Sequence, residues 1–160
     1  MYAHDNGGWF PHGLKTPEAS LTILCTNDPT IQSLLVGKHL PKNAVSNALA
    51  SNGILDPGSC GWHYVEGLWT NDSGDIAILW DKVRGYDHNA RRVSNLAHEV
   101  ITMDGSMHYI LKKDWAEFTQ RQRQLLAEAV ANRPLNSPPI RWSDEETLGP
   151  NLAKPGALKH

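Results

Sequence analysis

Apolar and polar positions are most clearly ordered around Asp104 and Gly105, where two short apolar runs flank this polar pair. An Asp-Gly pair in that setting is typical of a two-residue type I′ hairpin, because both turn residues need positive φ. The resulting register pairs Val100 with Tyr109 across the two strands. The sequence therefore predicts a β-hairpin that Asp104 and Gly105 hold in register.

Two earlier segments also have the composition of β-strands. Residues 62–65 and 76–83 are rich in aromatic and β-branched residues, and Gly, Asn and Asp lie at their ends. With the hairpin, they predict an antiparallel sheet.

Helices are predicted where apolar residues recur every three or four positions rather than every second one. Asp28 and Pro29 indicate a helix start, with Asp as the N-cap and Pro at the first helical position. Residues 43–51 place apolar side chains on one face, and Gly53 follows as a stop. Residues 5–20 contain many glycines and prolines and are expected to form a loop.

A longer helix is predicted from Asp114 to about Asn132, because Asp can cap its start and Pro134 ends it. Residues 133–160 contain five prolines and show little periodicity. We expect them to form an extended tail, with Trp142 as its candidate for packing.

These elements combine strands with helices. Residues 1–132 are expected to form one globular head, and residues 133–160 a Pro-rich C-terminal extension. A chain of 160 residues is long enough to bury the core of one domain.

Charge and hydropathy exclude some classes of partner. The formal net charge of −2 gives no bulk attraction to nucleic acid, so none is expected as a partner. The longest apolar run, Ile76 to Trp80, is far shorter than the roughly 20 residues of a membrane-spanning helix. Tyr2 and Ala3 read as the last turn of a helix that enters a Gly-rich loop, so we expect the chain to have been cut from a longer protein.

The two cysteines, Cys25 and Cys60, are too far apart in sequence for a thioredoxin-type redox pair. Two thiols are also too few for a typical structural zinc site. The spacing leaves two alternatives, one structural disulfide or two buried thiols.

Calcium is the candidate cofactor. Residues 71–75 form a loop of oxygen donors, including Asp72 and Asp75, and calcium prefers such ligands. The loop lacks the 12-residue pattern of an EF-hand, and a sequence of this type also forms an ordinary turn. Both interpretations stay open, and no other cofactor is expected.

Candidate catalytic residues do not form a motif. His88, His98 and Asp104 are the best subset for a metal site, but His98 and Asp104 would lie too far apart along one strand to bind the same ion. His98 and Asp104 could also be combined with Ser94 or Ser106 for nucleophilic catalysis, but no G-x-S-x-G elbow, Walker loop or G-x-G-x-x-G is present. The sequence therefore favours a protein that is not an enzyme. Six tryptophans suggest either core packing or an exposed platform for glycans.

Three segments together resemble the pilin-like proteins, related to type II secretion pseudopilins, that carry a prepilin-type N-terminal signal and an H-x9-DG C-terminal signature. Residues 2–11 resemble the segment that follows the hydrophobic helix in this family. Residues 62–68 and 75–81 are similar to its middle strands, and residues 98–106 to its terminal hairpin. Ser94 stands where the family has the signature histidine, and the predicted helix after residue 114 extends beyond the usual ending.

The resemblance implies a non-catalytic structural subunit of a pilus or a pseudopilus-like filament. Its head would have an α+β fold, in which an antiparallel sheet with a C-terminal Asp-Gly hairpin packs against helices. The head would lie outside the cytoplasm, in the periplasm or at the cell surface, with an N-terminal helix anchoring the full-length protein in the inner membrane. That helix would mediate self-assembly and contacts with other pseudopilin or secretion components. An oxidising compartment favours a bridge between Cys25 and Cys60, and calcium sites in some pseudopilins favour the Asp72–Asp75 loop.

Two other functions remain open. The first is a surface module that binds glycans or other ligands through exposed tryptophans. The second is a small metal-dependent hydrolase, which would need His and Asp side chains that converge in a cleft.

Overall fold

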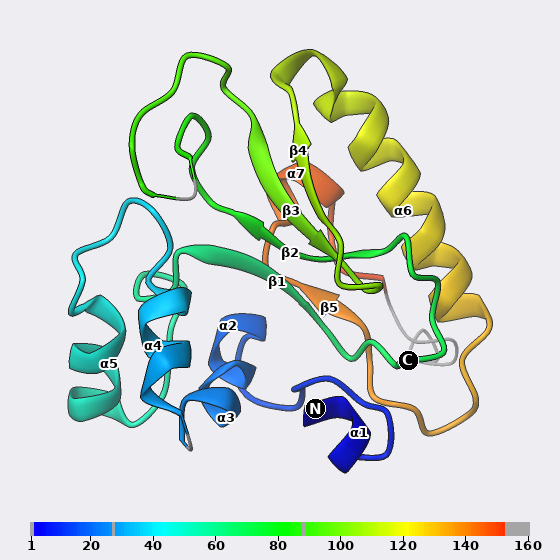
Figure 1. Ribbon diagram of the computed structural model, residues 1–160. Helices are drawn as coiled ribbons and strands as arrows, with labels where there is room; N and C mark the ends of the chain where they lie inside the picture. Colours follow the sequence, from blue (N-terminus) through cyan, green and yellow to red (C-terminus); the bar gives the residue numbers. More distant parts are fainter. Residues whose placement is uncertain (1, 27, 88, 153–160) are drawn as a thin grey trace.

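The computed structural model describes residues 2–26, 28–87 and 89–152 and has the predicted α+β class. One antiparallel sheet of five strands lies at its centre, in the order β4-β3-β2-β1-β5 (Figure 1). The strands are β1 (Trp62–Glu66), β2 (Ala77–Asp81), β3 (His98–Thr102), β4 (Met107–Ile110) and β5 (Arg141–Trp142). β1 and β2 fall where the composition predicted strands.

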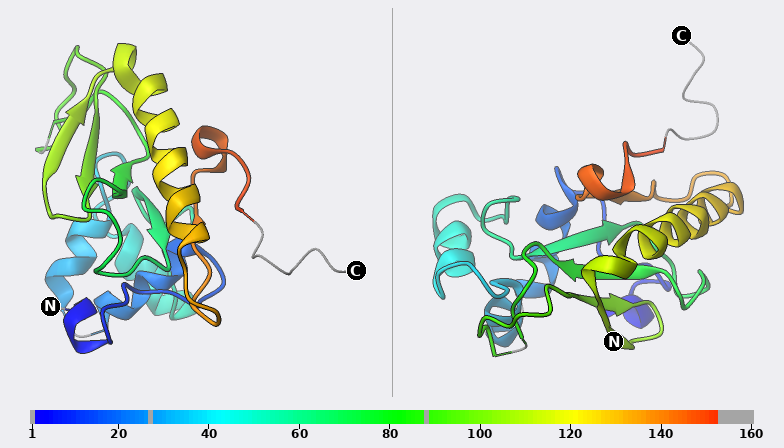
Figure 2. Two further views of the ribbon diagram at one scale, coloured as in Figure 1. Left: turned by 90° about the vertical axis from the view of Figure 1, so that its right-hand side faces the viewer. Right: turned by 90° about the horizontal axis from the view of Figure 1, so that it is seen from above.

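The helices flank this sheet. They are α1 (Tyr2–Asp5), α2 (Pro17–Ser20), α3 (Thr22–Cys25), α4 (Pro29–Leu35), α5 (Ala44–Asn52), α6 (Trp115–Ala131) and α7 (Glu145–Leu148), with a 3-10 turn at Lys112–Asp114. α6 and α7 lie on one side of the sheet, whereas α2 and α3 lie on the other side (Figures 1 and 2). We call the side that carries α6 the helix face and the other side the groove face.

Local capping explains two predicted helices and one that the sequence interpretation missed. Asp28 Oδ1 accepts a hydrogen bond from the Thr30 amide at 2.9 Å and starts α4. Gly53 ends α5 with φ of 68°. Residues 17–20, expected as loop, are helical because Thr16 Oγ1 accepts a bond from the Ala19 amide. Pro17 follows that cap at a position where proline favours a helix start.

The turn between β3 and β4 differs from the prediction. Val100 pairs with His108 rather than with Tyr109. Among the turn residues only Gly105 has positive φ, at 84°, and Thr102 closes a three-residue loop through its amide bond to the Ser106 carbonyl at 3.0 Å. The predicted type I′ turn is therefore wrong. The strands are instead joined by a three-residue loop whose last residue, Gly105, has a left-handed backbone conformation.

Side-chain hydrogen bonds explain this choice. Asp104 Oδ1 accepts bonds from the Thr102 hydroxyl at 2.6 Å and from the Ser106 amide at 2.9 Å. They favour the ionised carboxylate and hold the pKa of Asp104 below its ordinary value. The one-residue shift in register moves Tyr109 to the groove face.

The C-terminal segment, expected as an extended tail, packs on the head as far as residue 152. β5 pairs with β1, with Val65 opposite Trp142, and forms one edge of the sheet. Ile140 and Trp142 are buried, as is Leu148 in α7. The prolines of this segment interrupt any regular spacing of its apolar residues. Ile140, Trp142 and Leu148 nevertheless reach the core.

The main core lies between the helix face of the sheet and α6. Trp80 and Val100 point from β2 and β3 toward this side, and Leu126 from α6 is buried there. In the described ranges, no helix has both the length and the apolar composition required to cross a membrane.

Candidate functional site

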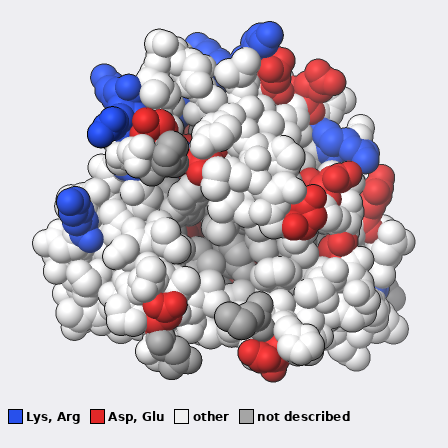
Figure 3. Space-filling view, viewed as in Figure 1, with Lys and Arg blue, Asp and Glu red and all other residues white. Residues whose placement is uncertain are grey.

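The groove face contains an open apolar cavity of about 270 Å³, which we call the sheet groove. Its lining comes from the N-terminal segment, α2–α3, the three central strands and the β3–β4 turn. The apolar lining residues are Phe10, Pro11, Leu21, Leu24, Tyr64, Ile78, Leu79, Ile101 and Met103. Figure 3 shows this face hollowed at its centre, with most charged side chains around the rim.

Local backbone features produce the groove. The pairing of β2 with β3 shifts between Ala77 and Leu79, so Ile78 and Leu79 both line the groove despite their adjacent positions in a strand. The Tyr64 hydroxyl donates to the Pro11 carbonyl at 2.7 Å and fixes the N-terminal segment along one side. The groove is therefore bounded by hydrogen-bonded backbone rather than by free loops.

Apolar surface continues from the groove to the free edge of the sheet. β4 is an edge strand, and Met107 lies opposite Ile101 on the groove face. Met107 and Tyr109 are 52% and 51% exposed. A soluble monomer seldom leaves adjoining large apolar side chains uncovered, so this surface is typical of a contact site.

A buried group of charged side chains lies at the other end of β2 and β3. Asp81 accepts from Lys38 Nζ at 3.2 Å and contacts His98 Nδ1 at 2.5 Å. Lys38 also contacts the Glu99 carboxylate. These four side chains, which we call the Asp81 network, are each at most 9% exposed.

The Asp81 network has little capacity for acid–base catalysis. Arg84 Nε donates to His98 Nε2 at 2.8 Å, so the histidine proton lies on Nδ1, toward Asp81. Trp115 stacks on the His98 ring with a centroid distance of 4.1 Å. Both ring nitrogens are occupied and one ring face is covered, an arrangement that favours a structural role. Polar His98 and Glu99 at the start of an apolar strand were the only sequence signal for this network.

Asp72 and Asp75 do not converge. Asp72 Oδ2 accepts from Arg133 Nη2 at 2.7 Å and from the Trp69 amide at 2.6 Å, whereas Asp75 is exposed. Among the described residues, no three His, Cys, Asp or Glu side chains form a group that could hold a metal ion. Calcium binding at this loop stays a prediction.

Cys25 and Cys60 are both buried and are free thiols in this structure. Burial raises the pKa of Cys60 to about 11, and the nearby Cys25 adds a smaller upward effect. The bridge in an oxidising compartment stays a prediction.

Among the described residues, His98 and Asp104, which were considered for hydrolysis, each have other partners. His88 lies outside the described residues. His98 is engaged by Asp81, whereas Asp104 bonds within its own turn. None of the six tryptophans is fully exposed: Trp80, Trp115 and Trp142 are buried and the other three are half-buried. Ligand binding through tryptophans stays a prediction.

Comparison with family models, curated proteins and solved structures finds no match to this chain.

Proposed function

We propose that the chain is the extracytoplasmic head of a non-catalytic, pilin-like subunit that assembles into a pilus or a type II secretion pseudopilus-like filament. In the full-length protein an N-terminal helix would anchor the head in the inner membrane and mediate assembly. The observation that carries this proposal is the sheet groove, an apolar surface on the central strands that lies open to solvent.

The groove suits the apolar face of a helix. It runs beside the N-terminal segment, because Phe10 and Pro11 form part of its lining. Burying apolar surface contributes about 25 cal/mol per Å², so covering the groove and the adjoining Met107 and Tyr109 would stabilise an assembled state. A helix laid in an apolar groove is a common mode of protein recognition.

The buried charges also favour a structural role. Glu18 pairs with Lys82 at 2.9 Å, and Glu66 pairs with Arg141. Asp144 accepts from Trp80 Nε1 at 2.9 Å. With the Asp81 network, these contacts use at least one oxygen of each of these buried carboxylates to hold segments together, whereas Glu18 Oε2 makes no hydrogen bond within the described residues.

To test this proposal, the complete gene product is expressed in a bacterium that has a prepilin peptidase. We expect it in the inner-membrane fraction and in shed filaments, whereas residues 1–160 alone should be monomeric or weakly associated and show no hydrolytic activity. A gene product that begins at Met1 and stays in the cytoplasm would contradict the proposal.

A further inference from the structure

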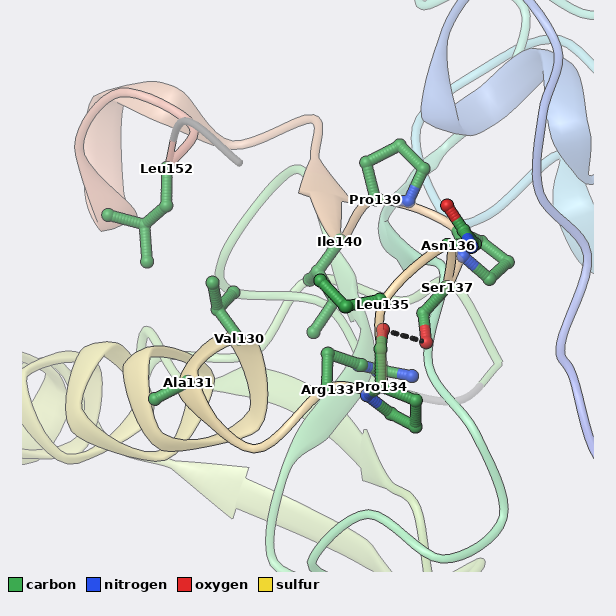
Figure 4. A pocket seen from close by; sticks show the side chains of 11 residues that line it. Val130, Ala131, Arg133, Pro134, Leu135, Asn136, Ser137, Pro139, Ile140 and Leu152 are labelled. Atoms are coloured by element: carbon green, nitrogen blue, oxygen red, sulfur yellow. Dashed lines mark hydrogen bonds between the residues drawn. The ribbon is translucent and has the colours of Figure 1, made fainter. Parts of the chain in front are cut away.

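The two edges of the central sheet differ in how their backbone groups are satisfied. At the β5 edge, the Trp142 amide donates to Asn151 Oδ1 at 2.7 Å, and Asn151 Nδ2 donates to the Trp142 carbonyl at 3.2 Å. Glu145 Oε1 accepts from the same Nδ2 at 2.7 Å and holds Asn151 in place. The next residue, Leu152, lines a cavity with Val130 of α6, beside β5 (Figure 4). This edge therefore cannot pair with another strand unless Asn151 moves away.

The β4 edge is open in the part of the chain that the structure describes, because no strand follows β4 in the sheet order. The Thr102 amide donates to the Ser106 carbonyl at 3.0 Å, so the backbone groups of Ser106 point toward β3. In an antiparallel pair, successive residues point these groups to alternate sides. The amides and carbonyls of Met107 and Tyr109 therefore point away from β3, along with about half-exposed side chains. Such an edge is a template for a further strand.

The β4 edge is complementary to a second copy of itself. An antiparallel pair with its two-fold axis at His108 places Met107 of one copy opposite Tyr109 of the other. Both residues have outward-pointing amides and carbonyls, so each of these pairs can exchange backbone hydrogen bonds in both directions. Their side chains lie on the groove face and would cover one another, as cross-strand neighbours do in a sheet.

The charges at the two ends of β4 favour the same register. With the axis at His108, Asp104 of one copy corresponds to Lys112 of the other, and both side chains are exposed. Opposite charges in facing positions stabilise a strand pair. Moving the register by two residues would bring Asp104 to Ile110 or to Asp114 instead, and neither is a favourable partner for a carboxylate.

We propose that the β4 edge binds the β4 edge of a second copy of this chain and forms one continuous sheet across a two-fold axis. Assembly stops at two copies, because Asn151 closes the β5 edge. β4 has only four residues, so the interface is small and the dimer dissociates readily. A two-fold contact joins heads of opposite orientation, so it acts on free heads or between neighbouring filaments and does not depend on the proposed filament.

The test is sedimentation equilibrium of residues 1–160 between about 10 µM and 1 mM, with a reductant present. We expect a monomer–dimer equilibrium with a dissociation constant on the order of 0.1 mM. In ¹⁵N spectra over the same range, the amides of residues 106–110 should shift with concentration. A protein that stays monomeric at 1 mM, or that forms species larger than a dimer, would overturn the proposal.

Two variants locate the contact on β4. Tyr109→Pro removes an outward-pointing amide and keeps the ladder to β3, so it should weaken the dimer at least about tenfold. His108→Lys places two like charges opposite each other at the axis, and it should weaken the dimer at least about tenfold as well.

The matched control is Leu34→Lys, which adds the same charge at a 62% exposed residue of α4 and should leave the dissociation constant unchanged. Circular dichroism checks that each variant folds. If Tyr109→Pro does not fold, His108→Lys decides the question, because His108 is exposed. A folded His108→Lys protein that dimerises as tightly as Leu34→Lys would show that another surface holds the two copies together.

Discussion

His98 and Asp81 are joined through Nδ1 and Oδ1 at 2.5 Å, and this contact connects β2 to β3 beneath the ring of Trp115. The second Asp81 oxygen accepts from Lys38, which follows α4, and from the Glu99 amide at 3.0 Å. One carboxylate thus connects three segments that lie far apart in the sequence.

We expect Asp81→Asn to destabilise the protein by about 3–5 kcal/mol, because it leaves the buried Lys38 and His98 without their shared anionic partner. The free energy of unfolding in urea measures this loss. Asp75→Asn is the matched control, since Asp75 is exposed, and it should change stability by less than about 0.5 kcal/mol. Equal stability of both variants would show that the network contributes little.

Gly105→Val should cost more than about 1 kcal/mol, because a β-branched residue resists the φ of 84° that the turn requires. Nothing lies within 4 Å of the position that a Cβ would take, so the cost is conformational rather than steric crowding. Gly105→Asn should cost less, since Asn tolerates this region. The midpoint of urea denaturation measures the stability of each variant. Unchanged midpoints in both variants would contradict the turn geometry.

Protein exported to an oxidising compartment should contain a Cys25–Cys60 bridge. Thiol titration of unfolded, non-reduced protein should then detect no free thiol. Reduced protein, purified from the cytoplasm of the expression host, serves as the control and should give two. Two reactive thiols in the exported protein would exclude the bridge.

The reduced, folded protein should react slowly with iodoacetamide. The thiolate is the reactive form, and a pKa of about 11 for Cys60 makes it rare at pH 8. Alkylation should be about a hundredfold slower than in the unfolded chain, whose thiol pKa is about 8.5. Because folding raises this pKa, the stability that the protonated thiol contributes is present below about pH 8.5 and lost as pH rises toward 11. Rapid alkylation at pH 8 would show that Cys60 is accessible.

Met103→Glu should reduce filament formation by the full-length subunit, because it places a charge in the lining of the sheet groove. The yield of sheared filaments measures this effect, and circular dichroism of the isolated head checks that it still folds. Leu135→Glu is the control, since it lies outside the groove. Normal filament yield from a folded Met103→Glu head would show that the groove is not an assembly surface.

The sequence by itself determined part of the local structure. The start of α4 follows from Asp28 and Pro29, and the end of α5 from Gly53, because each residue acts on backbone groups within one turn. The composition of β1 and β2 likewise reflects how their side chains pack within a strand. These features, with the α+β class, required no knowledge of distant contacts.

Only the tertiary structure decided the hairpin register, the place of the C-terminal segment and the candidate sites. The hairpin register depends on Asp104 bonding to Thr102 and Ser106 rather than adopting positive φ. Residues 133–152 carry no periodic pattern, so only the pairing of β5 with β1 showed that they complete the sheet. The sheet groove and the Asp81 network combine residues from several segments, and long-range packing alone brings such residues together.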